Sequence, residues 1–518
     1  MTNEITGGPQ TARDKVLSLD ALAALAQASR NAGKTVVLCH GVFDLVHLGH
    51  VRHIETARRE GDVLLVTVTA DRYVNKGPGR PIFPDTMRAE MLAAIGSVTA
   101  VAVNPGPSAE NVLDAIKPDI YVKGSDYENP DEDVTGKITS ERRTVERHGG
   151  RVVFTKDITF SSSTLINRYL DVYDPPLRDC LNSFRERNAL PEVLELIERV
   201  KDMRVLLVGD TIIDEYQFVT PQGKAQKENI IATRYVGREQ YAGGIIAAAN
   251  HVSSFCRDVE VLTGLGDDPA DEAFVRANLR DNVTLTAISA KGRPTTRKTR
   301  FIEASYNRKL FEVYHMDDSP LEGATRSAID DVIARRAGEF DVVIVTDFGH
   351  GLIGPSTVEA LVANARFLAV NAQTNSGNFG FNLITKYPRA DYVCIDTPEA
   401  RLALGDKFSG IDELVGHRLP ERIGCARLIV THGSHGCYTY DRMAGIHRIP
   451  AFTKQVIDTV GAGDAFLAVT SPIVAAGGPM DYVGFIGNAA GAMKVGIVGH
   501  RNSVEKVPLV KFVTALLK

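Results

Sequence analysis

Two histidines one helical turn apart, His47 and His50, carry the first chemistry that the sequence suggests. They lie in the stretch G-V-F-D-L-V-H-L-G-H at 41–50, directly after the apolar run 35–38. This pattern is typical of a buried parallel strand, a tight turn at Gly41 and a helix. Backbone N–H groups at such a helix start attract phosphate, and the imidazoles add further donors. The stretch therefore predicts nucleotidyl transfer, in which fixed donors stabilise charge on the α-phosphate and the pyrophosphate.

A zinc site is one alternative for these histidines, because His53 continues their spacing. No nearby Cys or carboxylate completes a four-ligand zinc set. A second alternative is a pair of surface histidines without a role. Phe43 and Asp44 in front of the pair, together with the strand and the glycine, favour the nucleotide-binding interpretation.

Cations follow the next predicted strand, 63–69. It ends near Asp71 and leads into a loop with Lys76 and Arg80, and the helix after the loop carries Arg88. Sites gather at strand ends in open α/β sheets, so we expect these side chains near a triphosphate. A solvated surface turn is the alternative for the loop.

Two later motifs in the same region also follow predicted strands. K-G-S-D-Y begins at 123 and contains Gly124 and Asp126. The hydroxyl-bearing residues S-S-S-T at 161–164 precede the helix 165–170. They form either a second anion-binding site or an ordinary helix N-cap. Strands and helices alternate from 35 to 170, which predicts a parallel sheet.

These motifs occur in the order found in the cytidylyltransferase-like nucleotidyltransferases, which this region resembles: H-x-G-H, a strand-end Asp, K-G-x-x-R-P, a helix Arg, K-G-x-D-Y and S-S-T. The K-D-I-T-F segment at 156–160 looks nearer the heptose-phosphate branch than the glycerol-phosphate branch, which has R-T-E-G. The resemblance implies that the catalytic groups are His47, His50 and Lys76. It implies nucleotide binding by Gly41, Phe43, Asp44, Arg88, Gly124, Asp126, Ser162, Ser163 and Thr164.

Length and composition limit the class of protein. The chain has 518 residues, of which 44% are hydrophobic and 24% charged, with a net charge of −5. Two or three domains are expected at this length, and without a basic stripe we expect no nucleic-acid partner. We expect no membrane segment and no signal peptide, because the apolar runs are short and the N-terminus is polar. We therefore expect a cytoplasmic protein whose cysteines are reduced and lie in the core.

A second set of acidic residues follows buried strands after residue 203. Asp210 and Asp214 come after the strand 205–208, and Asp347 ends another apolar strand. Paired carboxylates can hold sugar hydroxyls by hydrogen bonds. The semi-polar segments 229–235 and 297–314 predict a small separate sheet that excludes water from this site.

The motif D-T-V-G-A-G-D at 458–464 is the most informative one in this half of the chain. Small residues between glycines let backbone N–H groups close around an anion at a helix start. Asp464 can then take a proton from a substrate hydroxyl while the N–H groups stabilise the transferred phosphoryl group. An ordinary glycine-rich turn is the alternative.

This motif and the G-D-x-x-x-D-x-Y opening at 209–216 resemble the ribokinase-like (PfkB) sugar kinases, and the resemblance extends from 205 to 507. It implies that Asp464 is the general base and that Asp396 and Glu399 organise Mg²⁺. It implies nucleotide binding by Gly461, Ala462, Gly463, Thr431, Gly433 and Asn488. It implies sugar binding by Asp210, Asp214, Gly243, Gly244 and Asp347.

Several positions depart from the pattern of that family. Ala247 stands where a sugar-contacting Asn is common, His350 replaces a Lys, and N-A-Q at 371–373 replaces D-P-K. The transfer machinery is intact and the sugar-recognition residues are rewritten, so the accepted sugar stays open. No role follows from the sequence for the Asn-rich loop 371–382.

We therefore predict an α/β protein with two domains. A Rossmann-like nucleotidyltransferase with a parallel sheet occupies 34–170, a helical linker occupies 171–202, and a ribokinase-like α/β/α domain with a small β lid occupies 203–518. Both halves resemble the bifunctional kinase and nucleotidyltransferase family of ADP-heptose synthesis, with the domain order reversed. Because ribokinase-like lids often pair across a two-fold axis, we expect a homodimer.

The predicted function is bifunctional nucleotide-sugar synthesis. The kinase domain would use MgATP to phosphorylate the anomeric hydroxyl of a sugar phosphate similar to heptose 7-phosphate. The other domain would transfer a nucleotidyl group from ATP or CTP to the sugar 1-phosphate and release pyrophosphate. The alternative is a cytidylyltransferase for a polyol or amino-alcohol phosphate, fused to a kinase-like domain that is non-catalytic or acts on a different sugar.

Overall fold

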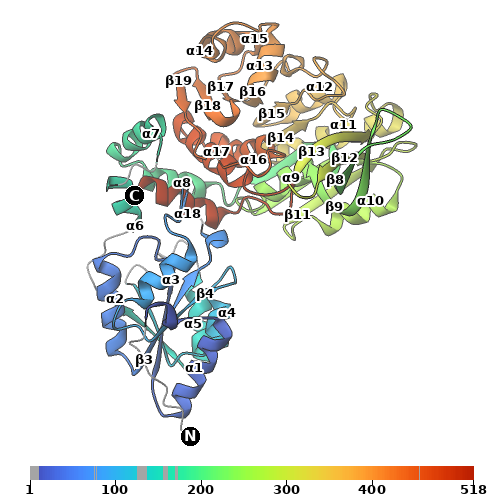
Figure 1. Cartoon of the computed structure of the whole chain (residues 1–518). Helices are drawn as coiled ribbons and strands as arrows, with labels where there is room; N and C mark the ends of the chain where they lie inside the picture. Colours follow the sequence, from blue (N-terminus) through green and yellow to red (C-terminus); the bar gives the residue numbers. More distant parts are fainter. Residues whose placement is uncertain are drawn as a thin grey trace. The chain divides into compact units, whose positions relative to one another are not determined.

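The computed structural model describes residues 11–74, 76–77, 79–124, 137–155, 162–169, 173–453 and 455–518 (Figure 1). The chain forms two compact units, which are described separately below. Unit 1 comprises Met1–Asp174 with Val510–Lys518, and unit 2 comprises Pro175–Leu509. Most of the predicted linker therefore groups with unit 2, and the last residues of the predicted kinase segment group with unit 1.

Unit 1 is built on a parallel sheet with the strand order β1-β4-β3-β2-β5-β6. Strands and helices alternate along the chain, as predicted. The strands are β1 (Val16–Leu17), β2 (Val36–Gly41), β3 (Val63–Thr69), β4 (Ala100–Asn104), β5 (Ile120–Gly124) and β6 (Arg151–Thr155). The helices are α1 (Leu19–Asn31), α2 (Leu48–Arg59), α3 (Asp85–Ala93), α4 (Glu110–Ile116), α5 (Lys137–Arg147) and α6 (Ser162–Tyr169).

Helices cover both faces of this sheet because its central strands are apolar on both sides. Val37 and Cys39 of β2 pack in one core with residues of α2 and α3. Val36 and Leu38 pack in the opposite core with residues of α1, α4 and α5. This arrangement confirms the predicted α/β class and places the carboxyl ends of β2, β3 and β5 along one edge of the sheet.

Unit 2 is built on a larger sheet with the order β11-β10-β7-β14-β15-β16-β17-β18-β19. Its ladders are parallel from β11 to β17, and β18 and β19 are antiparallel. The strands are β7 (Arg204–Gly209), β10 (Asp258–Leu265), β11 (Val283–Ser289), β14 (Val342–Asp347), β15 (Leu368–Ala372), β16 (Tyr392–Asp396), β17 (Arg427–Thr431), β18 (Cys437–Asp441) and β19 (Gly445–Ile449).

Helices pack on this sheet through apolar surfaces, with α9 against β7 and β10, and α16 against β14 and β16. A separate core joins the sheet to residues of α11, α12 and α13. The helices are α7 (Pro175–Glu186), α8 (Leu190–Arg199), α9 (Ile245–Val252), α10 (Pro269–Ala277), α11 (Gly323–Arg336), α12 (Pro355–Asn364), α13 (Thr397–Leu404), α14 (Ile411–Glu413), α15 (Leu419–Ile423), α16 (Ala462–Ala475) and α17 (Met480–Lys494). The last helix of the chain is α18 (Lys506–Leu517), which begins in this unit.

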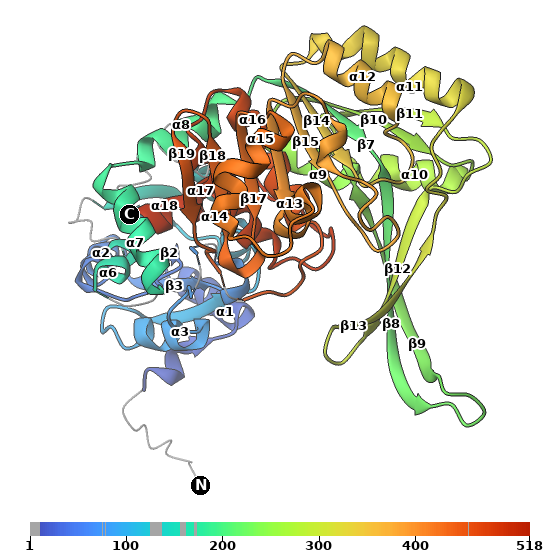
Figure 2. The same ribbon diagram turned by 90° about the horizontal axis from the view of Figure 1, so that it is seen from above.

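A second, smaller sheet in unit 2 has the order β13-β12-β8-β9. Its strands are β8 (Thr211–Lys224), β9 (Ile231–Gly244), β12 (Thr296–Glu303) and β13 (Arg308–His315). Figure 2 shows them extending away from the larger sheet. The predicted lid sheet is therefore present. The expectation that Asp214 lies in a strand-end turn was wrong, because Asp214 belongs to the long lid strand β8.

Pro175 and Pro176 are the first two residues of α7, where a missing N–H costs nothing because first-turn N–H groups have no intrahelical acceptor. All six cysteines are free, and all but Cys180 are buried. Across the described ranges, none of the helices has both the length and the apolar character needed to cross a membrane.

Candidate active sites

In unit 1 the stretch 41–50, which contains both histidines, forms the turn from β2 into α2. His47 is the N-cap of α2: its Nδ1 accepts a hydrogen bond from the Gly49 N–H at 3.1 Å, and its own N–H donates to His50 Nδ1 at 3.4 Å. The two imidazole centroids lie 4.0 Å apart, and the Phe43 ring packs edge-on against His50 at 5.2 Å. A Cβ at Gly41 would lie 3.1 Å from the Phe43 ring. The turn therefore fixes both histidines at the start of α2.

Burial disfavours the positively charged forms of His47, His50 and Lys76. Burial lowers the pKa of His50 to about 3, with a smaller effect from His47, and burial and Lys76 lower the pKa of His47. Burial and the neighbouring Arg80 lower the pKa of Lys76 to about 8. Among the described residues, the buried His47 Nε2 has no hydrogen-bond partner. An arriving phosphate would favour the charged forms of all three groups, which makes this a suitable anion site.

Arg80 joins two of the predicted nucleotide-binding residues, Asp44 and Ser163. It forms an ion pair with Asp44 in which both side chains are 0% exposed, and its Nη2 donates to the Ser163 hydroxyl at 3.4 Å. The Ile82 N–H donates to the second oxygen of Asp44 at 2.6 Å. In the described part of the chain, Arg80 Nη1 is buried and has no acceptor. Asp44 therefore orients Arg80, whose unpaired N–H group can bind an anion.

Arg88 lies on α3, the helix predicted to carry it, and its guanidinium contacts groups of the chain. Its side chain is fully buried, and it donates to the carbonyl oxygens of Phe83 at 2.9 Å, Thr69 at 2.8 Å and Val42, and to Asp71 at 2.5 Å. Through these acceptors Arg88 holds the ends of β2 and β3 together. Its predicted contact with the nucleotide stays a prediction.

The remaining predicted residues of unit 1 are placed only in part. Gly124 ends β5, and a Cβ there would meet no atom within 4 Å. Ser162 and Thr164 belong to the first turn of α6, but their side chains lie outside the described part of the structure, as does Asp126.

In unit 2 the motif 458–464 forms the turn that begins α16. Gly461 is the N-cap with φ 75, and Ala465 N–H donates to its carbonyl at 3.0 Å. The Ala462 N–H donates a long hydrogen bond to the Thr459 carbonyl, at 3.3 Å. Asp464 lies in the first helical turn and is 6% exposed, and burial raises the pKa of its carboxyl. A buried carboxyl beside Gly461 and Gly463 at a helix N-terminus fits a general base next to an anion site.

Gln373, which sequence reasoning did not single out as a site residue, contacts this base. Its Nε2 donates to Asp464 Oδ1 at 3.1 Å. Gln373 comes directly after β15, at the position where the family pattern has Lys. The first residues of the Asn-rich loop therefore reach the carboxyl of Asp464.

Asp214 is held by Arg300 and His500, two residues that the sequence analysis also missed. It pairs with Arg300 of β12 and with His500, whose Nε2 lies 3.4 Å from Asp214 Oδ2. Burial raises the pKa of Asp214, but the hydrogen bonds from His500 and Arg300 outweigh it, and the pKa is well below its usual range. A Cβ at Gly243 would lie 2.0 Å from Asp214 Oδ2, so only glycine fits there. Asp214 is therefore an ionised anchor between the lid and this site.

His500 lies between Asp214 and the turn at Gly461. A Cβ at Gly461 would lie 2.3 Å from His500 Cε1. His500 is 5% exposed, and no described residue is a hydrogen-bond partner of its buried Nδ1. No motif marked this residue in the sequence.

Asp210 and Asp347 hold neighbouring strand ends together. Asp210 accepts hydrogen bonds from the N–H groups of Phe348 at 3.1 Å and His350 at 3.4 Å. Burial, and then the charge of Asp347, raise the pKa of Asp210 to about 7. Gly244 has φ 57, and a Cβ there would lie 2.5 Å from the Asp210 carbonyl oxygen.

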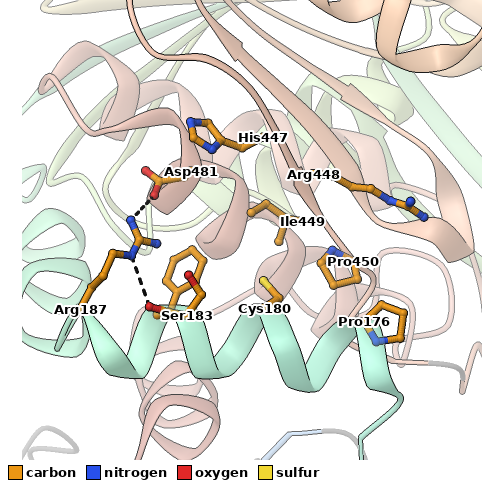
Figure 3. A pocket seen from close by; sticks show the side chains of 10 residues that line it. Pro176, Cys180, Ser183, Arg187, His447, Arg448, Ile449, Pro450 and Asp481 are labelled. Carbon is orange, nitrogen blue, oxygen red and sulfur yellow. Dashed lines mark hydrogen bonds and ion pairs between the residues drawn. The ribbon is translucent and has the colours of Figure 1, made fainter.

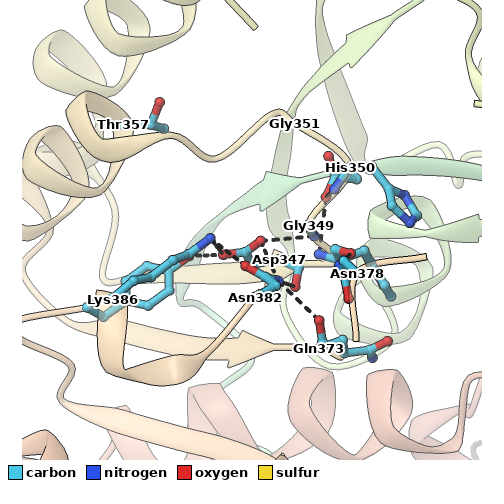
Figure 4. Close-up of polar contacts among 12 residues, drawn as sticks. Asp347, Gly349, His350, Gly351, Thr357, Gln373, Asn378, Asn382 and Lys386 are labelled. Carbon is cyan, nitrogen blue, oxygen red and sulfur yellow. Dashed lines mark hydrogen bonds and ion pairs between the residues drawn. The ribbon is translucent and has the colours of Figure 1, made fainter. Parts of the chain in front are cut away.

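The Asn-rich loop encloses Asp347, as Figure 4 shows. Asp347 accepts from Asn382 Nδ2 at 3.0 Å, Tyr387 OH at 2.6 Å and Lys386 Nζ at 2.5 Å. Asn378 and Asn382 also donate to the carbonyls of Phe348 and Asp347. Because its oxygens accept these hydrogen bonds and it is 1% exposed, Asp347 fixes the loop. Its predicted contact with a sugar stays a prediction.

The predicted magnesium pair forms a capping box at the start of α13. Asp396 accepts from the Glu399 N–H, and Glu399 accepts from the Asp396 N–H, both at 2.8 Å. Burial, and then Asp396, raise the pKa of Glu399 above its ordinary value. Two close carboxylates that resist ionisation suit a cation, and Mg²⁺ is held by one or two carboxylates together with water and phosphate. The donor set therefore fits Mg²⁺, although no cluster of three or more acidic, His or Cys groups occurs within the described residues.

On the predicted nucleotide side, Thr431 ends β17 and Gly433 opens the following short turn with φ 53. Asn488 of α17 donates through Nδ2 to the carbonyls of Ile449 at 3.0 Å and Pro450 at 3.1 Å. The amide N–H group of Asn488 therefore holds the end of β19, and nucleotide binding by Asn488 stays a prediction.

Unit 2 also has an open cavity of about 520 Å³ between α7, β19 and α17 (Figure 3). Arg187 crosses one end of it and pairs with Asp481 at 2.8 Å. None of the predicted site residues is among the described side chains that line this cavity. The cavity is therefore separate from the Asp464 site.

Comparison with known families identifies the architecture. A family model described as pfkB family carbohydrate kinase matches residues 203–507, which is more than half of the chain. The chain belongs to the pfkB carbohydrate kinase family. In this pfkB-family chain, a model described as cytidylyltransferase-like also matches residues 38–168. The two matches contain the Asp464 site and the histidine site, respectively.

The pfkB-family chain is similar to two curated relatives. Bifunctional protein HldE of Pelobacter propionicus is 27% identical over 307 residues, which cover 59% of this chain and 62% of that protein. Bifunctional protein HldE of Methylobacillus flagellatus is 39% identical over 159 residues, covering 30% of this chain and 31% of that protein. In each alignment the chain thus spans less than two thirds of the relative.

A solved structure gives the same fold. Phosphofructokinase-2 from Escherichia coli matches with a TM-score of 0.50 and 13% identity. The match covers 61% of this chain and 100% of the phosphofructokinase-2 chain. At this identity the likeness shows the fold alone. The ribokinase-like α/β/α architecture predicted for the second half is therefore confirmed.

Proposed function

We propose that this chain is a bifunctional enzyme of nucleotide-sugar synthesis. Unit 2 phosphorylates the anomeric hydroxyl of a sugar phosphate similar to heptose 7-phosphate, with MgATP as donor. Unit 1 transfers a nucleotidyl group from ATP or CTP to the sugar 1-phosphate and releases pyrophosphate. The observation that carries the proposal is that one chain holds both a buried carboxyl, Asp464, at a glycine-rich helix start and a histidine pair beside Lys76.

In the kinase step, Asp464 accepts the proton of the attacking sugar hydroxyl. The oxygen of that hydroxyl forms the new bond to the γ-phosphorus, while the bond from the γ-phosphorus to the β-phosphate oxygen breaks and ADP leaves. Backbone N–H groups at the start of α16 stabilise the charge on the transferred group. Asp396 and Glu399 would hold Mg²⁺ through its waters, and the ion would neutralise charge on the phosphates. Asp214, His500 and Arg300 connect this site to the lid.

In the transferase step, an oxygen of the sugar 1-phosphate attacks the α-phosphorus, and pyrophosphate leaves. His47, His50 and Lys76 stabilise the charge that develops on the phosphates, and no covalent nucleophile is required. Arg80, oriented by Asp44, supplies another donor at the same edge of the sheet.

The proposal includes three finer points. The cytidylyltransferase-like match precedes the kinase match, and we propose that this order is reversed relative to the bifunctional family of ADP-heptose synthesis. A cytoplasmic location fits an enzyme that uses nucleoside triphosphates. A homodimer paired through the lid is supported by exposed apolar side chains on lid strands, which are Ile231, Tyr235, Val236, Phe311 and Val313.

A second candidate keeps the transferase but makes unit 2 non-catalytic or specific for a different sugar. It is favoured by the rewritten loop, because Gln373 occupies one oxygen of the proposed base. Magnesium-dependent ADP formation from a sugar phosphate, lost in Asp464→Asn, would support the bifunctional enzyme. ADP formation that is unchanged in Asp464→Asn would contradict the proposed kinase site.

A further inference from the structure

Lys494 is a buried lysine at the end of α17 that no part of the proposed mechanism uses. Its side chain is 0% exposed, which is exceptional for a lysine. Its Nζ donates to two backbone carbonyls, those of Val460 and Gly499, each at 2.7 Å. A buried ammonium group with such partners has a definite structural task, because removing it from water is costly.

The two carbonyls belong to the segments that build the phosphoryl site. Val460 directly precedes Gly461, the N-cap of α16, and Gly499 directly precedes His500. The peptide group is planar and trans, so the C=O of Val460 and the N–H of Gly461 point in opposite directions. With its oxygen held by Lys494, the peptide directs the Gly461 N–H away from the lysine, as an anion site at this turn requires.

The charges around Lys494 favour its ammonium form. Asp458 lies in the same turn, where it accepts hydrogen bonds from the N–H groups of Gly499 at 2.8 Å and Val460 at 3.1 Å. Burial lowers the pKa of Lys494, while Asp458, Asp464 and Asp214 oppose that effect. Lys494 also stands at the carboxyl end of α17, where a positive charge is stabilised by the helix dipole.

We propose that Lys494 is a positioning residue for phosphoryl transfer: its ammonium group acts as an internal cation that fixes the turn 458–463 and the loop carrying His500 in the geometry needed for catalysis. This inference rests on the proposed kinase function of unit 2. Lys494 acts through backbone that it orients, and it does not touch the substrate.

The experiment compares Lys494→Ala with Lys494→Met in the full chain. The Ala variant leaves space at the carbonyls for an ammonium ion from solution, whereas the Met variant fills the space of the stem with an apolar chain. We expect kcat for ADP formation to fall about 100-fold in both variants, as on loss of one oxyanion-hole donor. The KM for MgATP should change much less than kcat, because the affected N–H groups act mainly in the transition state.

Ammonium chloride should raise kcat of Lys494→Ala about tenfold. It should leave kcat of Lys494→Met and of the unchanged protein unaffected. Tetramethylammonium chloride is the control for ionic strength. A matched control is Lys309→Met. Lys309 also contacts Asp458, at 2.7 Å, but its side chain is 40% exposed, so ammonium should have no effect on that variant.

A folded Lys494→Met protein with unchanged kcat would overturn the inference, as would equal rescue by tetramethylammonium. The melting temperature separates this inference from the proposed function. If the unchanged protein has no kinase activity, the proposed function fails. An ammonium-specific rise in the melting temperature of Lys494→Ala would then still support the internal cation, and its absence would refute it.

Discussion

Replacing Gln373 by Met tests how the proposed general base is held. The backbone of Gln373 is fixed independently of its side chain, because its N–H donates to the Asp347 carbonyl at 2.8 Å and its carbonyl accepts from Asn382 at 3.1 Å. The substitution keeps the length of the side chain and removes its N–H donors. The change is therefore confined to the hydrogen bond with Asp464.

The expected magnitude follows from that hydrogen bond. Gln373 Nε2 lies 3.1 Å from Asp464 Oδ1, and hydrogen bonds to charged groups contribute about 1.5–3 kcal/mol. The bond stabilises the carboxylate, so its loss raises the pKa of Asp464 further above the ordinary value to which burial has already raised it. A larger share of the base is then protonated at neutral pH. At about 1.4 kcal/mol for each factor of ten, the loss of about 1.5–3 kcal/mol should lower kcat by a factor between about 10 and about 100.

The assay is ADP release measured as a function of pH. The acid limb of the kcat profile should move to higher pH in Gln373→Met, and further in Gln373→Glu, which places a second carboxyl beside the base. Gln222→Met is the matched control, because Gln222 is exposed and donates only to the Thr220 carbonyl at 3.5 Å. An unchanged acid limb in Gln373→Met would refute the assignment of Asp464 as a base oriented by Gln373.

Three further predictions concern unit 1. His50→Ala should abolish pyrophosphate release while kinase activity persists, and a variant with the full transferase rate would contradict the histidine site. The pKa of Lys76 is lowered to about 8, so its positive charge is lost as pH rises through that value. The transferase kcat/KM for nucleotide should therefore fall above about pH 8, and Lys76→Arg should remove this fall because Arg stays charged. Arg80→Met leaves Asp44 buried and unpaired, and should lower the free energy of unfolding of unit 1 by about 3–5 kcal/mol in urea titrations. Asp44→Asn combined with Arg80→Met should cost less, and an equal cost would argue against the buried pair.

Much of the fold could be predicted from the sequence because its strands are short apolar runs that end at glycine or acidic residues. The strand Val63–Thr69 has the predicted bounds, and the lid sheet follows from semi-polar segments. The placement of Asp214 was wrong because the residues after Gly209 continue as the long lid strand β8 instead of a turn.

The candidate sites were predictable only where adjacent residues form a motif. His47 with His50, and Gly461 with Asp464, are neighbours in the chain, so their spacing alone indicates phosphate chemistry. Gln373 and His500 meet Asp464 and Asp214 across long sequence separations. The ammonium group of Lys494 donates to the backbone carbonyls of Val460 and Gly499, and such partners leave no trace in the residue types.

Arg88 and Asp347 show the opposite limit of sequence reasoning. Both stand at positions where a charged side chain suggests ligand binding, yet each is buried and occupied by neighbouring groups. Residue type and motif position do not distinguish a ligand contact from a charged residue that orients the chain around a site.

The measurement that tests the central claim most directly is mass spectrometry of the products formed when the protein is mixed with a heptose 7-phosphate, MgATP and MgCTP. A nucleotide-linked heptose with release of ADP and pyrophosphate is the predicted result, and its base would identify the nucleotide used by unit 1. If neither a heptose bisphosphate nor a nucleotide-heptose forms, and an added heptose 1-phosphate is also unchanged, the bifunctional account is contradicted.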